Sequence, residues 1–338
     1  MNVERSPAPL SRRDLLAFSF FRSDAGSSHW VRLHRAAMAC RFEITLSGED
    51  EGQVPAARAA LDEAGRIEAA LTVFRDTSEL VRVNRTAGQA AAVVDEDLFG
   101  LLQLCQRLHG ETEGAFDITS TPLSRCWGFL KREGRLPAVE EIEAARARVG
   151  MPGVALDADA RSVRFARPGM ELNLGSIGKG YALGRMGQGL RAQGVAHALL
   201  SAGGSSVLAL GGRGAGWCID VRPRRLEGQR LCRLYLRDGA MGTSGAGEQY
   251  VDVEGKRYGH VLDPRSGWPA GQTLSATVVT AQPALADALS TAFFVGGAEL
   301  ARRYCEAHPE TLAVVTPDDA ARRPQVFGHF PGAKLEGM

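Results

Sequence analysis

The stretch from Ser275 to Gly297, SATVVTAQPALADALSTAFFVGG, constrains the fold more than any other part of the chain. Its first part predicts a strand from Ala276 to Thr280. Pro283 predicts the start of a helix, because a proline at the first helical position loses no hydrogen bond. We expect this helix to end at Gly296 and Gly297. Nearly all its side chains are apolar on every face, which is typical of a buried core helix.

Three polar residues interrupt the apolar surface of this helix, namely Asp287, Ser290 and Thr291. Since they lie three and four residues apart, their side chains share one patch. Burying a carboxylate costs at least several kcal/mol unless it is paired, hydrogen-bonded or metal-bound. Asp287 therefore either faces water or caps a neighbouring loop, or it belongs to a hard-cation or catalytic site. The pattern alone leaves both interpretations open.

Length and charge narrow the class of protein. The 338 residues suffice for one large domain or two ordinary ones, and 40 basic against 39 acidic residues give a net charge of +1. This balance gives no reason to expect a nucleic acid partner. We find no run of about 18 apolar residues, so we expect no transmembrane segment. Without repeats or linkers, the sequence favours one domain at 30–330, with an N-terminal tail at 1–29 and a C-terminal tail at 331–338.

The N-terminal segment allows two interpretations. Arg12 and Arg13, followed by the apolar stretch from Leu15 to Phe21, resemble a twin-arginine export signal. That stretch is short and is interrupted at Arg22 and Asp24. A basic tail without fixed structure is the alternative.

A glycine-rich turn precedes a second predicted helix, in the segment NLGSIGKGYA from Asn173 to Ala182. The free N–H groups at such a helix start bind phosphate, and Lys179 adds a positive charge. The segment is not a P-loop, because Gly175 and Gly178 enclose only two residues and glycine follows the lysine. A dinucleotide-binding GxGxxG pattern is also missing.

Two further segments carry candidate functional residues. GHVLDPRSG places His260 and Asp263 near a Pro/Gly turn, and His260 is the best candidate for a general base by residue type, with Asp263 to orient its ring. The alternative is that His260 only braces the turn. The segment from Gly114 to Phe129, GAFDITSTPLSRCWGF, mixes aromatic and polar residues, which suits either a flat ligand or a loop packed onto the core.

The remaining pattern predicts a mixture of strands and helices. Strands are expected at Arg41 to Leu46, His197 to Ser201, Val207 to Leu210, Leu231 to Leu236 and Thr311 to Thr316. Helices are expected at Val54 to Phe74, Asp95 to Gly110 and Pro137 to Gly150, and a hairpin at Val154 to Phe165. The segment from Asp76 to Asn84 is interpreted as a turn that leads into a short polar stretch.

Together these segments resemble the ApbE family of flavin transferases. The resemblance covers about Met38 to Gly297, and its motifs follow the family's order: MACRFEI, DTSELVRVN, GAFDITSTPLSRCWGF, NLGSIGKGYA, SAGG with TSG, and GHVLDPRSG with ADALSTAFFVGG. The resemblance implies an α+β fold of antiparallel sheets with flanking helices, similar to the tunnelling fold, in a single domain. It also implies that the protein binds FAD, splits its pyrophosphate with Mg2+ and attaches FMN to a threonine of a partner protein, releasing AMP.

Carried over residue by residue, the resemblance implies a metal site at Asp287, Thr291 and the backbone carbonyl of Ser176. Lys179 would assist the reaction together with His260 and Asp263. The implied FAD contacts are Met38, Phe74, Asn84, Ala115, Phe116, Asp117, Asn173, Lys179, Gly203, Gly204, Thr243, Ser244 and Val261.

This sequence departs from the family at three positions. Asn173 and Gly184 stand where aspartates are usual, and Phe74 stands where tyrosine is common. The loss of an acidic group at position 173 would alter the FAD contacts or the environment of Lys179. It leaves both metal-binding side chains in place.

The expected function is therefore Mg2+-dependent transfer of FMN from FAD to a threonine hydroxyl of an acceptor flavoprotein. The alternatives are an FAD diphosphatase, in which water replaces the threonine, and an FAD-binding protein without chemistry. Acceptors of this family tend to be membrane-associated redox subunits outside the cytoplasm. With Arg12 and Arg13, this favours a location in the periplasm or on the outer face of the inner membrane, and the cytoplasm is the alternative.

Overall fold

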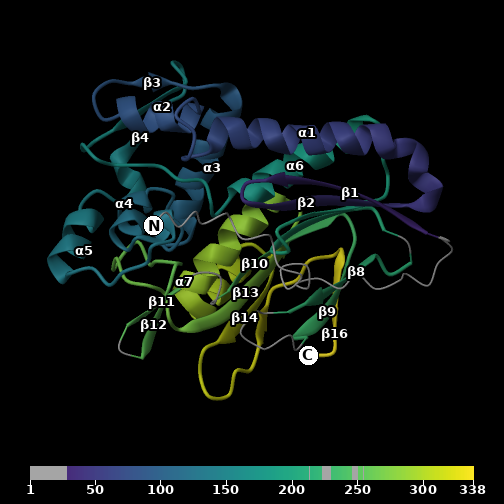
Figure 1. The fold of residues 1–338 in the computed structure, drawn as a ribbon. Helices are drawn as coiled ribbons and strands as arrows, with labels where there is room; N and C mark the ends of the chain where they lie inside the picture. Colours follow the sequence, from purple (N-terminus) through teal and green to yellow (C-terminus); the bar gives the residue numbers. More distant parts are fainter. Residues whose placement is uncertain (1–28, 213, 223–229, 246–249, 254) are drawn as a thin grey trace, which may run out of the picture.

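The computed structural model describes residues 29–212, 214–222, 230–245, 250–253 and 255–338. The possible export signal at 1–29 lies outside the described residues except for its last position. The main body is an eight-stranded sheet with helices on one face and a smaller sheet on the other (Figure 1).

The large sheet is antiparallel throughout, in the order β1-β2-β6-β7-β10-β13-β14-β15. Its strands are β1 (Trp30–Ala37), β2 (Cys40–Ser47), β6 (Ala198–Ala202), β7 (Ser206–Leu210), β10 (Gly239–Gly245), β13 (Thr273–Thr280), β14 (Leu312–Pro317) and β15 (Gln325–Phe327). Every residue of β6, β7 and β13 is buried, because layers of structure cover both faces of the sheet.

Alternation of side chains across the strands builds the two layers. Leu200 packs with α1 (Val54–Leu71) and α6 (Gly178–Ala192) on one face, whereas its neighbour Leu199 packs against the small sheet on the other. The small sheet has the order β16-β9-β8, with β8 at Trp217–Val221, β9 at Cys232–Leu236 and β16 at Ala333–Glu336. The same helical face of the large sheet also carries α7 (Pro283–Ala307), which packs on β10 and β13.

A second group of elements lies mainly on one side of these layers, at the left of Figure 1. The helices are α2 (Glu79–Thr86), α3 (Glu96–Glu111), α4 (Thr121–Cys126) and α5 (Val139–Arg146), and the single 3-10 turns are η2 (Gly48–Gln53), η3 (Phe129–Lys131) and η4 (Met151–Gly153). The strands form a sheet of β3 (Ala92–Val93), β5 (Ser162–Phe165) and β4 (Val154–Asp157), and a ribbon of β11 (Tyr250–Val253) and β12 (Lys256–Gly259).

The predicted fold class, α+β with antiparallel sheets and flanking helices, is confirmed. The predicted strands correspond to β2, β6, β7, β9, β13 and β14, the three helices to α1, α3 and α5, and the hairpin to β4 and β5. The segment expected as a turn and polar stretch before Asn84 is instead α2, whose first turn is capped by the Ser78 hydroxyl, 3.1 Å from the Val81 N–H.

Two boundaries differ from the prediction. Gly297, with φ of 73°, interrupts α7 without ending it, since the helical segment runs on to Ala307. The segment 331–338, expected as a tail, contributes β16, which pairs with β9. Phe330 is buried in the core of the small sheet and anchors this last strand.

The helix α7 was expected to be buried, and it is. By length and composition it would also pass for a membrane-spanning helix, yet 61% of its most apolar window is buried inside the fold. This burial identifies α7 as the core helix against which the large sheet packs.

Candidate functional site

The carboxylate of Asp287 lies where α7 meets β7 and the start of α6, and only 4% of the residue is exposed. The Ser206 hydroxyl donates a hydrogen bond of 2.7 Å to Oδ1, and the Gly180 N–H donates one of 3.0 Å to Oδ2. Lys179 Nζ lies 3.9 Å from Oδ1. Asp287 thus caps the first turn of a neighbouring helix, which is one of the two roles the sequence left open. Two donors occupy two of about four lone-pair sites of a carboxylate, so capacity for a cation remains.

A row of hydroxyl groups continues from this carboxylate along α7. Ser244 Oγ, on β10, lies 2.9 Å from Ser290 Oγ and 3.2 Å from Thr291 Oγ1. Ser290 in turn donates to the backbone carbonyl of Asp287 at 2.8 Å. We call the following residues the Asp287 cluster: Lys179, Ser206, Ser244, Asp287, Ser290 and Thr291.

Two glycines allow the backbone of α7 to approach so closely. A Cβ atom at Gly180 would lie 2.1 Å from the Pro283 carbonyl oxygen, and one at Gly242 would lie 2.3 Å from the Ala286 carbonyl oxygen. Both distances are far shorter than any van der Waals contact. These two positions therefore require glycine for α6 and β10 to reach the turn that carries Asp287.

The donor set of the Asp287 cluster fits a hard cation such as Mg2+. It offers one carboxylate and several hydroxyl oxygens, and Mg2+ typically binds one or two carboxylates together with substrate phosphates and water. Among the described residues no group of three or more His, Cys, Asp or Glu side chains could hold a metal.

The start of α6 adds positive potential beside this cluster. The partly buried Lys179 lies in its first turn, where the positive end of the helix dipole favours an anion. Asn173 fixes the preceding turn, because its Oδ1 accepts a hydrogen bond of 2.8 Å from the Gly175 N–H. Its own N–H donates to the Ile118 carbonyl at 2.8 Å, which links this turn to the GAFDI motif. Ser176 is a partly buried residue of the same turn.

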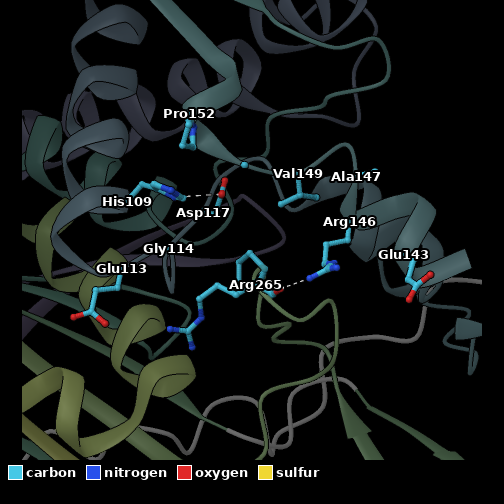
Figure 2. Close-up of a pocket in the computed structure, with 12 residues that line it drawn as sticks. His109, Glu113, Gly114, Asp117, Glu143, Arg146, Ala147, Val149, Pro152 and Arg265 are labelled. Atoms are coloured by element: carbon cyan, nitrogen blue, oxygen red, sulfur yellow. Dashed lines mark hydrogen bonds and ion pairs between the residues drawn. The ribbon is translucent and has the colours of Figure 1, made fainter. Parts of the chain in front are cut away.

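Asp117 organises the loop at residues 112–119, here called the GAFD loop. Its Oδ1 accepts hydrogen bonds from the Thr119 N–H at 2.8 Å and the Thr119 hydroxyl at 2.6 Å. Its Oδ2 accepts one from the Met151 N–H at 3.1 Å and lies 3.2 Å from His109 Nδ1 (Figure 2). Ala115 and Phe116 are each 1% exposed. Asp117 thus fixes the shape of the loop with its side chain, and the FAD contacts expected for Ala115, Phe116 and Asp117 stay predictions.

The turn between β1 and β2 has an unusual conformation for its residues. Met38 and Ala39 have φ values of 50° and 56°, a region that is costly for residues other than glycine. The Met38 N–H donates to Glu68 at 2.8 Å and so holds the turn. The Gly203 N–H donates to the Arg41 carbonyl at 3.0 Å. The structure thus brings the predicted contacts Met38 and Gly203 to neighbouring positions.

A chain of contacts extends this edge to the Asp287 cluster. The Thr243 N–H donates to the Ser205 carbonyl at 2.7 Å, which ties β10 to the turn that contains Gly203 and Gly204. Ser244, the next residue, belongs to the cluster itself. The predicted ligand contacts in the turn after β1, in the turn between β6 and β7, and on β10 therefore form one continuous edge.

Two other predicted FAD contacts have different surroundings. Phe74 is 73% exposed, just after α1. The Asn84 side chain pairs with the Leu172 backbone, accepting at 2.7 Å and donating at 2.9 Å. Asn84 therefore holds the strand that leads into the glycine turn, and a contact with FAD stays a prediction.

In the turn after β12, Asp263 has a partner that the sequence did not predict. Both oxygens of Asp263 accept hydrogen bonds from Arg265, at 2.9 Å from its N–H and Nε and at 2.8 Å from its terminal nitrogen. The His260 ring lies edge-on to Phe129, with ring centroids 6.5 Å apart. The Val261 carbonyl accepts from Ala270 at 2.9 Å. The roles of His260 and Asp263 in catalysis stay predictions.

Sequence reasoning missed the residues that act through others. Ser206, Gly242 and His109 support predicted site residues from separate elements, and nothing in their local sequence indicates which side chain they contact. Ser206 follows the glycine pair of the SAGG motif, and His109 lies in the last turn of the helix before the GAFD loop. The only sequence signal for these residues was that each lies next to a motif.

Comparison with protein families matches residues 38–316 to the ApbE family. An FAD:protein FMN transferase of Klebsiella pneumoniae (strain 342) is 34% identical over 236 residues, which cover 69% of this chain and 73% of that protein. An FAD:protein FMN transferase of Escherichia coli (strain K12) is 27% identical over 255 residues, covering 73% of each.

Solved structures share the fold. The crystal structure of the ApbE protein of Thermotoga maritima superposes with a TM-score of 0.81 at 29% identity, covering 88% of this chain and 97% of that one. The apo flavinyl transferase ApbE of Pseudomonas stutzeri gives a TM-score of 0.77 at 25% identity, covering 90% and 96%.

Proposed function

The chain belongs to the ApbE family, and we propose that it transfers FMN from FAD to a threonine hydroxyl of an acceptor flavoprotein, with release of AMP. The names of its relatives support the flavin chemistry. The observation that carries the proposal is the Asp287 cluster, where a helix start, a lysine and hard-cation oxygens meet. An FAD diphosphate bound with Mg2+ requires these three features together.

In this proposal Asp287 and Thr291, with the carbonyl of Ser176, would hold Mg2+ together with oxygens of the bound diphosphate. The metal neutralises charge on the diphosphate when bound. Lys179 binds the same phosphates, and the positive end of the α6 dipole attracts them. The GAFD loop, Met38, Gly203 and Val261 hold the rest of FAD, and the exposed Phe74 ring is available to stack on a flat ligand.

The transfer step is a substitution at phosphorus. The threonine oxygen forms a bond to the phosphorus nearer the flavin, and the bond from that phosphorus to the bridging oxygen breaks, so AMP leaves with the electron pair. The threonine proton passes to a base, for which we propose His260. Positioning and charge neutralisation account for most of the acceleration in such reactions.

The acceptor and compartment follow the same proposal. The acceptor is a redox protein that carries the flavinylated threonine and is associated with a membrane. We place the reaction in the periplasm or on the outer face of the inner membrane. Fractionation that finds only an uncleaved, cytosolic chain would contradict this location.

The direct test combines the purified protein with FAD, Mg2+ and a candidate acceptor domain, beside the same domain with its target threonine changed to alanine. Mass spectrometry should show FMN bound to the threonine, together with an equal amount of free AMP. The alanine domain should stay unmodified. If free FMN and AMP accumulate and the acceptor stays unmodified, the protein is an FAD diphosphatase. If FAD stays intact, the proposed function is wrong.

A further inference from the structure

His109 lies in the last turn of α3 and faces the carboxylate of Asp117 (Figure 2). Its Nδ1 is buried and lies 3.2 Å from Asp117 Oδ2, an ion-pair contact. The side chain of Asp117 is 2% exposed and that of His109 is 19% exposed. Little water therefore screens the attraction between the two groups.

The same histidine begins the turn that leads into the GAFD loop. The His109 carbonyl accepts a hydrogen bond of 2.9 Å from the Gly114 N–H. Glu113 and Gly114 both have positive φ values, 54° and 75°, so the turn is under strain at Glu113. Strain of this kind persists only where surrounding contacts hold the backbone. Main chain and side chain of His109 both supply such contacts.

Two features favour the cationic form of His109. The Asp117 carboxylate faces the ring, and the C-terminal end of α3 favours positive charge. The contact with the Asp117 carboxylate is the main cause that raises the pKa of His109 above its usual value of 6.5, and burial opposes the shift. The imidazolium is thus the form that fits this position.

Two charged groups near His109, Glu113 and Arg265, form ion pairs of their own. Glu113 lies 2.8 Å from Arg303, and Arg265 binds Asp263. His109, Glu113 and Arg265 line a cavity of about 530 Å³, and α5 contributes Glu143 and Arg146 to the same lining. Arg146 donates a hydrogen bond of 2.9 Å to the Arg265 carbonyl. Cys105, one turn earlier on α3, is buried, which raises its pKa and keeps it neutral. Asp117 is the charged group with which the His109 ring forms an ion-pair contact.

We infer that His109 is a positioning residue, whose imidazolium holds Asp117 and thereby keeps the backbone of the GAFD loop in the conformation that receives FAD. This inference rests on the proposed function, in which residues 115–117 contact FAD. His109 itself does not touch the substrate. It acts through Asp117, which ties Thr119 and Met151 to the same loop.

The inference predicts a pH dependence of FAD affinity. The folded protein favours protonated His109. The contribution of the imidazolium to FAD affinity is therefore fully present below the ordinary histidine pKa of about 6.5, and it is lost as the pH rises through the raised pKa of His109. FAD should therefore bind about tenfold more weakly at alkaline pH, the usual size of coupling between neighbouring sites. By linkage, bound FAD should raise the pKa of His109 further.

The experiment measures FAD affinity by fluorescence quenching from pH 5.5 to 9, roughly the range around histidine titration, in EDTA so that no turnover occurs. Wild type is compared with His109→Gln and with His308→Gln, whose ring stacks on Tyr304 at 4.2 Å on another element. We expect His109→Gln to bind FAD about tenfold more weakly than wild type at the acidic end of this range, and its FAD affinity should no longer depend on pH. His308→Gln should follow the wild-type curve.

A second measurement does not depend on the variant's folding. In wild type with labelled histidines, the NMR titration of His109 should shift to higher pH when FAD is added. Unchanged affinity and slope in folded His109→Gln, or an unshifted titration in wild type, would overturn the inference while leaving the proposed function intact. A wild-type protein that binds no FAD would instead overturn the proposed function, and with it this inference.

Discussion

The Asp287 cluster and the turn that carries His260 and Asp263 each hold a carboxylate near a cationic or titratable group, but they are built differently. The Asp287 cluster draws its side chains from α6, α7, β7 and β10, regular elements whose register fixes them. In the turn after β12, Asp263 bonds to Arg265, only two residues away. Helices and strands bring together residues that are far apart in the sequence, whereas in this short turn the carboxylate accepts hydrogen bonds from a residue that is close in the sequence.

The largest effect is expected for Asp287→Ala. The change removes the only carboxylate of the cluster, and with it the charge that holds Mg2+, so AMP release should fall at least about a hundredfold, as several kcal/mol of charge stabilisation implies. It also leaves the Ser206 hydroxyl and Gly180 N–H without their acceptor, at a cost of about 1–3 kcal/mol in stability. Chromatographic AMP assays and urea unfolding measure the two effects. A folded variant that releases AMP at the wild-type rate would remove Asp287 from the metal site.

His260→Gln tests the other side of the comparison. If His260 takes the threonine proton, transfer should slow by about 10²–10⁴ while FAD still binds, and the residual rate should rise toward alkaline pH. Single-turnover transfer and FAD titration separate the two quantities. Transfer at the wild-type rate across neutral pH would show that the histidine only braces the turn.

Lys179→Ala should have an intermediate effect. The amine lies beside Asp287 at the start of α6, and its loss removes charge-assisted hydrogen bonds worth about 1–3 kcal/mol. FAD affinity should fall by about tenfold to a hundredfold, with Lys179→Arg retaining part of it. Both variants can be titrated with FAD in EDTA. Wild-type affinity in Lys179→Ala would place this lysine outside the FAD site.

Ser206→Ala gives the smallest expected change and the most specific one. Without its hydroxyl the Asp287 carboxylate loses one of its two described hydrogen-bond donors, so Mg2+ affinity in the presence of FAD should fall about tenfold. Ser206→Thr, which keeps the hydroxyl, should restore part of it. The matched control is Ser275→Ala, because Ser275 is equally buried and its Oγ has no hydrogen-bond partner among the described residues.

Calorimetric titration with Mg2+ measures all three serine variants. We expect the affinity of Ser275→Ala to match that of wild type. Equal Mg2+ affinity in Ser206→Ala and Ser275→Ala would show that Ser206 supports only the fold.

The sequence predicted those features that depend on local periodicity. The shared patch of Asp287, Ser290 and Thr291 followed from helical spacing, and the structure places Ser290 and Thr291 against the same hydroxyl of Ser244. Partners from other elements could not be predicted, because strand order and register decide which side chains meet. Ser206 reaches Asp287 only because β7 lies next to β10 in the large sheet.

Hydrogen-bond partners within turns also could not be predicted. The pair of His260 and Asp263 stays a prediction, whereas the three hydrogen bonds that Asp263 accepts from Arg265 were not expected. The α2 segment was missed because its polar composition resembles a loop, and the Ser78 cap that begins the helix is a weak signal in sequence. Gly297 was predicted to end the helix because glycine is the usual C-terminal cap. The sequence does not distinguish such a cap from a glycine with positive φ inside a longer helical segment.

The central claim is that the Asp287 cluster is where the FAD diphosphate and a divalent cation meet. Crystals of the wild-type protein grown with FAD and Mn2+, measured for anomalous scattering, test this claim most directly. We predict one strong manganese peak in contact with Asp287 and Thr291, with the FAD diphosphate at the start of α6 beside Lys179. A manganese peak bound elsewhere, or an FAD diphosphate held away from α6, would contradict the account.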